Sequence, residues 1–161
     1  MRNLALVIGV ALATSGCLGQ SGPAAAQEAA RELNVNLRFG RMELVMERVS
    51  PGLRDAYVAQ HRNWGSTIRI ADSELDGMRL LSKEEALVIV KIAWYEPTEQ
   101  ELRVTTLRQT WKKEKDSWLL TAEARADGDL GLLGEHVPPA SKADPNERRP
   151  PAQFQTVRIA D

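Results

Sequence analysis

The centre of the chain alternates apolar and polar residues with a period of two, and no other feature constrains the fold as strongly. Four such segments follow one another between Ile68 and Ala124. Alternation of this kind is typical of β-strands that bury one face. The connections between the segments are short, and short connections join antiparallel neighbours, whereas parallel strands need long crossovers. The sequence therefore predicts an antiparallel meander of about four strands.

The first two segments differ in how much of their surface they are expected to bury. The first opens with Ile68 and Ile70, and the turn-forming residues of "DSELDG" (72–77) predict a bend or bulge there. The second, residues 86–94, is apolar on both faces apart from Lys91. A strand that is apolar on both faces is typical of the interior of a sheet.

The third segment, residues 102–111, changes phase along its length. Leu102 and Val104 occupy even positions, whereas Leu107 and Trp111 occupy odd positions. One inserted residue moves the following side chains to the other face, so this change predicts a β-bulge at residues 105–106. In the fourth segment the apolar residues share the even positions, namely Trp118, Leu120, Ala122 and Ala124.

Helical periodicity precedes the strands. From Ala26 to Leu37 apolar residues recur at three- and four-residue spacings, and Gly40 stands where such a helix would end. The stretch "LNVNLRF" (33–39) also alternates, so a strand is an alternative there. A second, short amphipathic run covers residues 42–49.

A third helix is expected after "VSPG". Ser50 can cap the free amide groups of a helix, and Pro51 at the first helical position loses no hydrogen bond. On this helix, which is predicted to end at Gly65, His61 lies four residues after Tyr57, so the two side chains are neighbours. Histidine suits acid–base chemistry near neutral pH. Without a second catalytic partner, a surface histidine packed beside a tyrosine is favoured.

Two tryptophans, Trp111 and Trp118, bracket the charged turn in "WKKEKDSW". A ligand clamp is one function for such a pair, but aromatic residues at strand spacing more often pack across a hairpin. The order of elements, helices before a curved antiparallel sheet, resembles the NTF2-like or cystatin-like α+β group over about residues 27–126. The final hairpin carries the pattern Q-x-W…W-x-L of this resemblance, with Gln109, Trp111, Trp118 and Leu120.

The resemblance implies an α+β fold in which N-terminal helices pack on a curved antiparallel sheet. Members of this group often hold a ligand between the helices and the sheet, and some use an acid there. By this analogy, a ligand pocket would be lined by Tyr57, His61, Asp72, Trp94 and Thr106, with Glu74 as a second carboxylate near the bend of the first strand. Function depends on the site and not on the fold, so no catalytic residue is assigned.

An apolar run near the N-terminus, "LALVIGVALA", covers Leu4 to Ala13. Spanning a bilayer takes about 20 residues, so this shorter run is expected to be the hydrophobic region of a signal peptide. Cys17, the single cysteine of the chain, follows in "ATSGC". This stretch resembles the lipobox of bacterial lipoproteins, although Thr14 stands where that family favours an aliphatic residue. The resemblance implies cleavage before Cys17 and attachment of diacylglycerol to its thiol.

Ordinary signal cleavage is the alternative, because A-x-A patterns end at Ala13 and at Ala26. Such a cut would leave Cys17 unpaired or remove it, and an odd cysteine in an exported chain needs an explanation. Lipidation supplies one and is favoured. The residue after the cysteine is Leu18 and not the aspartate that retains lipoproteins in the inner membrane, which implies anchorage at the outer membrane.

These observations divide the chain into a signal peptide (residues 1–16), a lipidated flexible tether (17–26), an α+β domain (27–135) and a proline-rich, largely disordered tail (136–161). The composition of the tail cannot bury a core. Its closing stretch "FQTVRIAD" is undecided between a docked strand and a loose end. Asp127 and Asp129 lack the other ligands of a calcium loop and are expected to be solvated turn residues.

Composition and motifs exclude several functions. A net charge of −1 without a basic stripe argues against nucleic-acid binding. No catalytic triad, nucleophile elbow, phosphate loop or zinc motif is present, so no catalytic residue, cofactor or metal is predicted. We expect a lipid-anchored lipoprotein of the cell envelope that binds a protein partner or a small ligand without catalysis. A small-molecule carrier or an enzyme with an NTF2-like cavity is the alternative.

Overall fold

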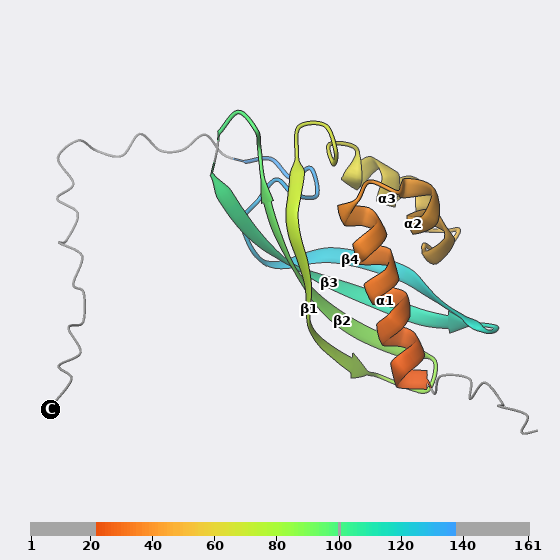
Figure 1. The fold of residues 1–161 in the computed structure, drawn as a ribbon. Helices are drawn as coiled ribbons and strands as arrows, with labels where there is room; N and C mark the ends of the chain where they lie inside the picture. The colour runs from red at the N-terminus through yellow and green to blue at the C-terminus, as the bar shows by residue number, and fades with distance from the viewer. Residues whose placement is uncertain (1–21, 100, 138–161) are drawn as a thin grey trace, which may run out of the picture.

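The structure, a computed structural model, describes residues 22–99 and 101–137. Helices come first along this part of the chain, and strands follow (Figure 1). The elements are α1 (Gly22–Arg38), α2 (Met42–Arg48), α3 (Arg54–His61), β1 (Arg69–Leu80), β2 (Glu85–Tyr95), β3 (Leu102–Glu114) and β4 (Ser117–Gly128).

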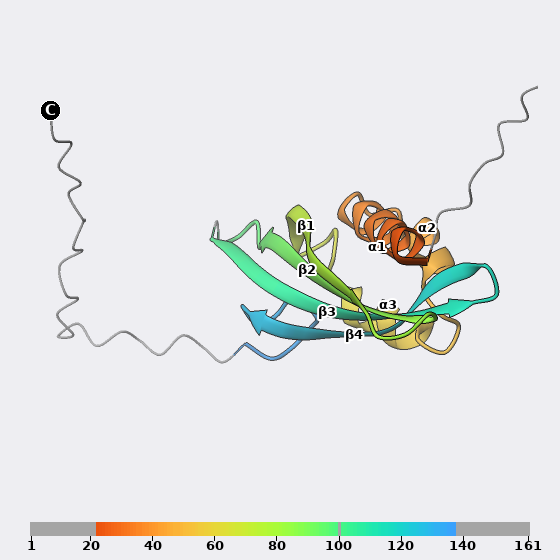
Figure 2. The ribbon, with the colours of Figure 1, turned by 90° about the horizontal axis from the view of Figure 1, so that it is seen from below.

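The strands form one antiparallel sheet in the order β1-β2-β3-β4. Helix α1 crosses one face of the sheet, and Figure 2 shows α1 and α2 on the same side of its curved surface. The predicted meander and the predicted α+β class, with N-terminal helices packed on an antiparallel sheet, are therefore confirmed.

The irregularities of the sheet agree with one prediction and contradict another. The pairing of β1 with β2 shifts register between Ile70 and Asp72 and again between Leu75 and Gly77, so the expected irregularity of the first strand is confirmed. In contrast, β3 pairs with β2 without any shift, and the bulge predicted within β3 at residues 105–106 is wrong.

The phase change of β3 in the sequence has another cause. Leu102 and Val104 are 63% and 45% exposed, whereas the odd positions 105–111 are buried throughout. Apolar residues at one end of the strand therefore do not mark its buried face. The extra residues lie in β4 instead, where the register against β3 shifts twice.

Helix α1 buries one face against the sheet. Its buried apolar residues are Ala26, Ala29, Ala30, Leu33 and Leu37, at the spacings that predicted a helix, so the strand alternative is wrong. The helix begins at Gly22, so residues 22–26, which were assigned to the tether, are its first turns.

A glycine ends helix α1. Gly40 has a φ of +68°, and its amide donates to the carbonyl of Leu37 at 3.0 Å. The amide of Arg41 donates to the carbonyl of Asn36 at 2.9 Å. This pair of bonds is the Schellman motif, which fixes the direction in which the chain leaves the helix.

The third helix begins later than the sequence predicted. Ser50 makes no side-chain cap, and α3 begins at Arg54. The backbone amide of Ser50 donates instead to the carbonyl of Leu120 in β4 at 2.9 Å, and Val49 forms an isolated bridge with the same residue. Contact with the sheet therefore fixes Ser50, and a turn separates it from the helix.

Large side chains fill the space between the helices and the sheet. Six of the largest have no or almost no exposed surface: Trp94, Trp111, Tyr57, Leu33, Leu107 and Leu120. Trp118 is 3% exposed, so both tryptophans of the last hairpin belong to the core, as strand spacing predicted. Among the described residues, these side chains therefore occupy the space between the helices and the sheet where the NTF2-like analogy would place a ligand.

Candidate functional site

Two of the five residues predicted to line a pocket lie in contact with each other. The rings of Tyr57 and His61 stack with their centroids 3.9 Å apart, and both side chains are buried. Trp64 also contacts the imidazole edge-on, with the ring centroids 4.5 Å apart. The imidazole of His61 therefore contacts two aromatic rings in the core, and its expected surface position is wrong.

The other three predicted residues do not form a pocket with this pair. Trp94 is buried, and its indole Nε1 donates to the hydroxyl of Thr105 at 2.8 Å. Thr106, the next residue along β3, points to the opposite face of the sheet because side chains alternate along a strand. Asp72 is exposed and pairs with Arg38 at 2.8 Å.

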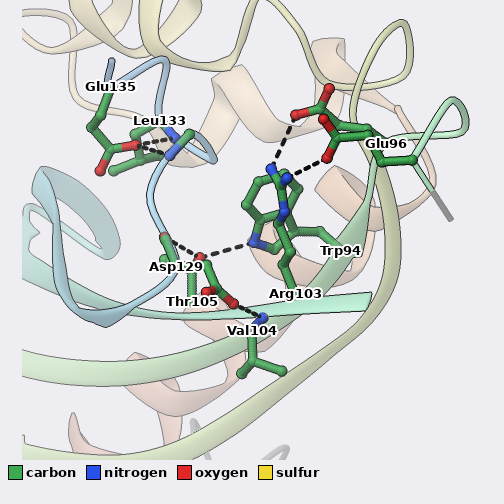
Figure 3. A network of polar contacts seen from close by, with 10 residues as sticks. Trp94, Glu96, Arg103, Val104, Thr105, Asp129, Leu133 and Glu135 are labelled. Carbon is green, nitrogen blue, oxygen red and sulfur yellow. Dashed lines mark hydrogen bonds and ion pairs between the residues drawn. The ribbon is translucent and has the colours of Figure 1, made fainter. Parts of the chain in front are cut away.

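A polar network occupies the end of the sheet shown in Figure 3. Thr105 accepts from Trp94 and donates to the carbonyl of Asp129 at 2.8 Å, while the Asp129 carboxylate accepts from the amide of Val104 at 2.7 Å. Arg103 lies over the ring of Trp94, 5.1 Å from its centroid, and pairs with Glu96 and Glu99. Asp129 therefore joins a turn to β3 and is not only a solvated turn residue.

A buried histidine–carboxylate pair joins α3 to β4. The Nε2 atom of His61 lies 3.0 Å from Oε1 of Glu123, and neither side chain has any exposed surface. The two groups meet off the line of a hydrogen bond, although their separation is that of an ion pair. Glu123 is the partner of His61 that sequence reasoning did not find.

Hydrogen bonds extend this pair to β3 and α1. The amide nitrogen of Gln109 donates to Oε2 of Glu123 at 2.6 Å and to Oδ1 of Asn34 at 3.1 Å. Asn34 donates back to Gln109 at 3.2 Å and to the carbonyl of Ala30 at 2.7 Å. Every amide hydrogen of Gln109 and Asn34 is used, as buried polar groups require. We call His61, Glu123, Gln109 and Asn34 the buried polar network.

One hydrogen bond fixes the orientation of the imidazole. Nδ1 of His61 lies 2.8 Å from the carbonyl oxygen of Tyr57, and a carbonyl oxygen only accepts, so Nδ1 carries a hydrogen. This bond directs Nε2 toward the Glu123 carboxylate.

The hydroxyl of Tyr57 is unsatisfied, as are Nε2 of His61 and Oε1 of Glu123 beside it. The hydroxyl is buried and has no hydrogen-bond partner among the described residues. Burial raises the pKa of the Tyr57 phenol well above its usual value, and the negative charge of Glu123 adds to this shift. The phenol therefore stays protonated at neutral pH and does not act as an acid there.

An imidazole–carboxylate pair is a general acid–base unit where a substrate can reach it. Here neither member has exposed surface, so the pair touches no solvent and connects two elements of the core. Among the described residues, no group of three His, Cys, Asp or Glu side chains could hold a metal ion. No described helix is long and apolar enough to cross a membrane.

A shifted strand phase hid Glu123 from sequence reasoning. The even positions Trp118 and Leu120 point into the core as predicted, but the register shifts after Leu120, and Glu123 replaces Ala122 on the inner face. Ala122 and Ala124, expected inside, are exposed. The sequence signal that could have found Glu123 is weak, because a bulge in a strand of small residues leaves no gap in the apolar pattern.

The lipid-attachment residue of the sequence prediction, Cys17, lies outside the described residues. So do the predicted signal peptide and residues 138–161 of the predicted tail. Their assignments stay predictions.

No protein-family model and no curated protein matches the chain in sequence. Among solved structures, the chain is similar to a SEC-C motif containing protein from Rhodopseudomonas palustris, with 12% identity and a TM-score of 0.51 over 67% of this chain and 83% of that one. Two domains of unknown function from Nostoc punctiforme, described as having a cystatin-like fold, match with TM-scores of 0.47 and 0.45. They are 15% and 12% identical and cover 65% and 68% of this chain, and 75% and 92% of their own. At 12% identity, the similarity to the Rhodopseudomonas palustris protein shows a shared fold and nothing about function.

Proposed function

We propose that the protein is a lipid-anchored lipoprotein of the cell envelope, at the outer membrane, and that its α+β domain is a non-catalytic binding module. The lipobox-like "ATSGC" carries the anchor, with Cys17 as the attachment residue. Two or more acyl chains, at about 0.8 kcal/mol per buried methylene, hold a protein on a membrane durably.

The position of α1 supports this anchor against cleavage after Ala26. That cut would fall inside the helix and remove five of its residues, 22–26, including Ala26, which has no exposed surface. Cleavage before Cys17 leaves the whole of α1 in the mature chain, with residues 17–21 between the lipid and the helix.

The large buried side chains of the described interior support a binding module over a carrier or an enzyme with a cavity. Tyr57, Trp94 and Leu107 fill the space between helices and sheet, and all three have no exposed surface. The described pair with acid–base capability, His61 with Glu123, is equally buried. Binding would therefore use the surface of the domain.

The mass of the mature protein, isolated from its native membrane, tests the anchor. We expect a chain that begins at Cys17 and carries diacylglycerol or more acyl groups, in the membrane fraction. The Cys17→Ala variant is expected to lose both the added mass and the membrane association. An unmodified chain that begins at residue 14 or 27 would overturn the proposal.

A further inference from the structure

A surface groove of about 430 Å³ lies where the end of α1, the start of α2 and the start of β1 meet. Its apolar lining comes from Leu37, Met42, Trp64 and Ile70. All four pack against or belong to the core, so the apolar surface they show in the groove rests on a rigid base.

The charged residues around this groove are basic. Arg38 and Arg69 line it together with the apolar residues, and no acidic side chain does. Arg38 is paired with Asp72, but Arg41 and Arg69 make no ion pair with any residue that the structure describes. Two other surface hollows of the domain differ, because Glu74 lines one and Glu28 and Asp116 line the other.

An exposed aromatic ring stands at the rim of the groove. Phe39 is 63% exposed, and the guanidinium groups of Arg38 and Arg41 lie 5.7 and 5.5 Å from its centroid. Arginine and large aromatic residues dominate the energetics of protein interfaces. The Schellman motif at Gly40 fixes the backbone between Phe39 and Arg41, so little conformational entropy is lost when a ligand binds them.

An apolar lining beside unpaired arginines is complementary to a ligand that offers an apolar side chain next to carboxylates. A membrane surface fits less well, because α1 separates the groove from Gly22, where the anchored segment enters the domain. A helix of 17 residues is about 25 Å long. The groove therefore lies a full helix length from the residue at which the proposed anchor would join the domain.

We propose that this groove binds an acidic segment of a partner protein, with an apolar side chain of that segment against Met42 and Trp64 and its carboxylates against Arg41 and Arg69. The proposal rests on the proposed function, since it names the site and the partner class of the binding module. It does not depend on the lipid, so the two can fail separately.

An array of acidic peptides tests the groove. Each eight-residue peptide carries one leucine or phenylalanine and two or three Asp or Glu residues, and a matched array carries Asn and Gln in their place. The full mature chain, purified in detergent, is applied to both arrays, and the strongest peptide is titrated by fluorescence anisotropy. We expect binding to the acidic array only, and affinity that falls with rising salt because the charges are exposed.

Charge reversal locates the binding surface. Arg41→Glu with Arg69→Glu is expected to weaken binding at least about tenfold. The matched control, Arg79→Glu with Arg108→Glu, changes the net charge equally at exposed positions of the sheet and is expected to change affinity less than about twofold. Phe39→Ala should weaken binding, whereas Val58→Ala, at a residue 49% exposed on α3, should not.

Several outcomes would overturn the proposal. These are the absence of binding to any acidic peptide, equal loss in the two double variants, or a dimer that Arg41→Glu with Arg69→Glu converts to a monomer, which would make a second copy the occupant. Tighter binding of Cys17→Ser to phosphatidylglycerol vesicles than to peptide, with the same dependence on Arg41 and Arg69, would make a membrane the occupant. Binding that appears only after removal of residues 138–161 would make that segment the occupant.

Discussion

At the scale of single residues, the stability of the domain is expected to be most sensitive to substitutions in the buried polar network. Four polar side chains, from α1, α3, β3 and β4, meet in an interior otherwise built from aromatic and aliphatic groups. Buried charges are tolerated only while each one keeps its partner. The network therefore makes the packing of α3 on β4 sensitive to single substitutions that leave the volume of the core almost unchanged.

Removal of the Glu123 carboxylate is expected to destabilise the domain strongly. Glu123→Ala leaves His61 without its charged partner and one Gln109 hydrogen without an acceptor, and breaking a buried pair in this way costs about 3–5 kcal/mol. Urea unfolding measures the loss. Glu84→Ala, at an exposed glutamate before β2, is the control and is expected to cost less than about 0.5 kcal/mol. Equal losses in the two variants would show that the buried pair contributes nothing.

Removal of the Tyr57 hydroxyl is expected to stabilise the domain, in contrast to removal of the Glu123 carboxylate. The Tyr57 hydroxyl is buried without a partner among the described residues, and such a group costs about 1–3 kcal/mol. Tyr57→Phe is therefore expected to raise the free energy of unfolding at neutral pH by about 1 kcal/mol. Tyr95→Phe, at a residue 37% exposed, is expected to change it by less than about 0.5 kcal/mol. A destabilised Tyr57→Phe variant would mean that the hydroxyl has a partner.

The raised pKa of Tyr57 also predicts how the free energy of unfolding changes at alkaline pH. In the unfolded chain the phenol ionises near pH 10.0, whereas burial and then the charge of Glu123 raise the pKa of Tyr57 in the folded chain. Below pH 10.0 both states keep the proton, so this group adds no pH dependence there. Above it only the unfolded state loses the proton, so the free energy of unfolding falls as pH rises toward the folded-state pKa. Urea unfolding at several alkaline pH values should show a shallower fall in Tyr57→Phe, and parallel curves would contradict this account.

At the scale of the elements, turns and bulges decide which side chains enter the core. The register shifts in β4 bring Glu123 inside, and the turn after β4 folds back so that Asp129 meets β3. Both features depend on backbone conformations that an ordinary strand does not adopt. Gly128, at the end of β4, has a φ of +84° and lies directly against β3.

The stability of three glycine-to-alanine variants is expected to depend on two properties of each glycine. These are a positive φ and the space available for an added Cβ. At Gly128 a Cβ would lie 2.2 Å from the carbonyl oxygen of Val104, so Gly128→Ala should unfold the domain or separate the end of β4 from β3. Gly40 also has positive φ but open space, so Gly40→Ala should cost only about 1–2 kcal/mol. Gly52 has neither constraint, and Gly52→Ala should be close to neutral. Thermal unfolding gives the ranking, and a Gly128→Ala variant as stable as Gly52→Ala would contradict the structure of this turn.

The same elements show what the sequence could predict and what it could not. The helical spacing of α1 and the alternation of β2 were predicted correctly, because each element buries one face along its whole length. The phase of β4 could not be read in this way, because its bulge falls among small residues that satisfy either face. For that reason His61 was recognised as a candidate, but its partner Glu123, which comes from another element, was not.

At the scale of the whole molecule, α1 connects the features on which the proposals depend. Its first residue, Gly22, follows the proposed anchor, and Asn34 belongs to the buried polar network. Its last turn positions Phe39 and Arg41 at the rim of the groove. The sequence placed the domain boundary at residue 27, inside this helix, because "PAAAQ" is compatible with a tether as well as with a helix. Tertiary burial of Ala26 decides between the two.

Two truncated chains test where the domain begins. A chain that starts at Gly22 keeps all of α1, whereas one that starts at Gln27 loses its first turns and with them Ala26, which is fully buried, and Ala25, which packs on the core. Burial of an aliphatic carbon contributes about 0.8 kcal/mol, so the shorter chain is expected to be less stable by about 1–2 kcal/mol in urea unfolding. The same difference should appear as faster amide hydrogen exchange in the remainder of α1, because the first turn of a helix supports the turns that follow. Equal stability and equal exchange in the two chains would mean that residues 22–26 do not contribute to the domain. Signal cleavage after Ala26 would then be as compatible with this fold as cleavage before Cys17.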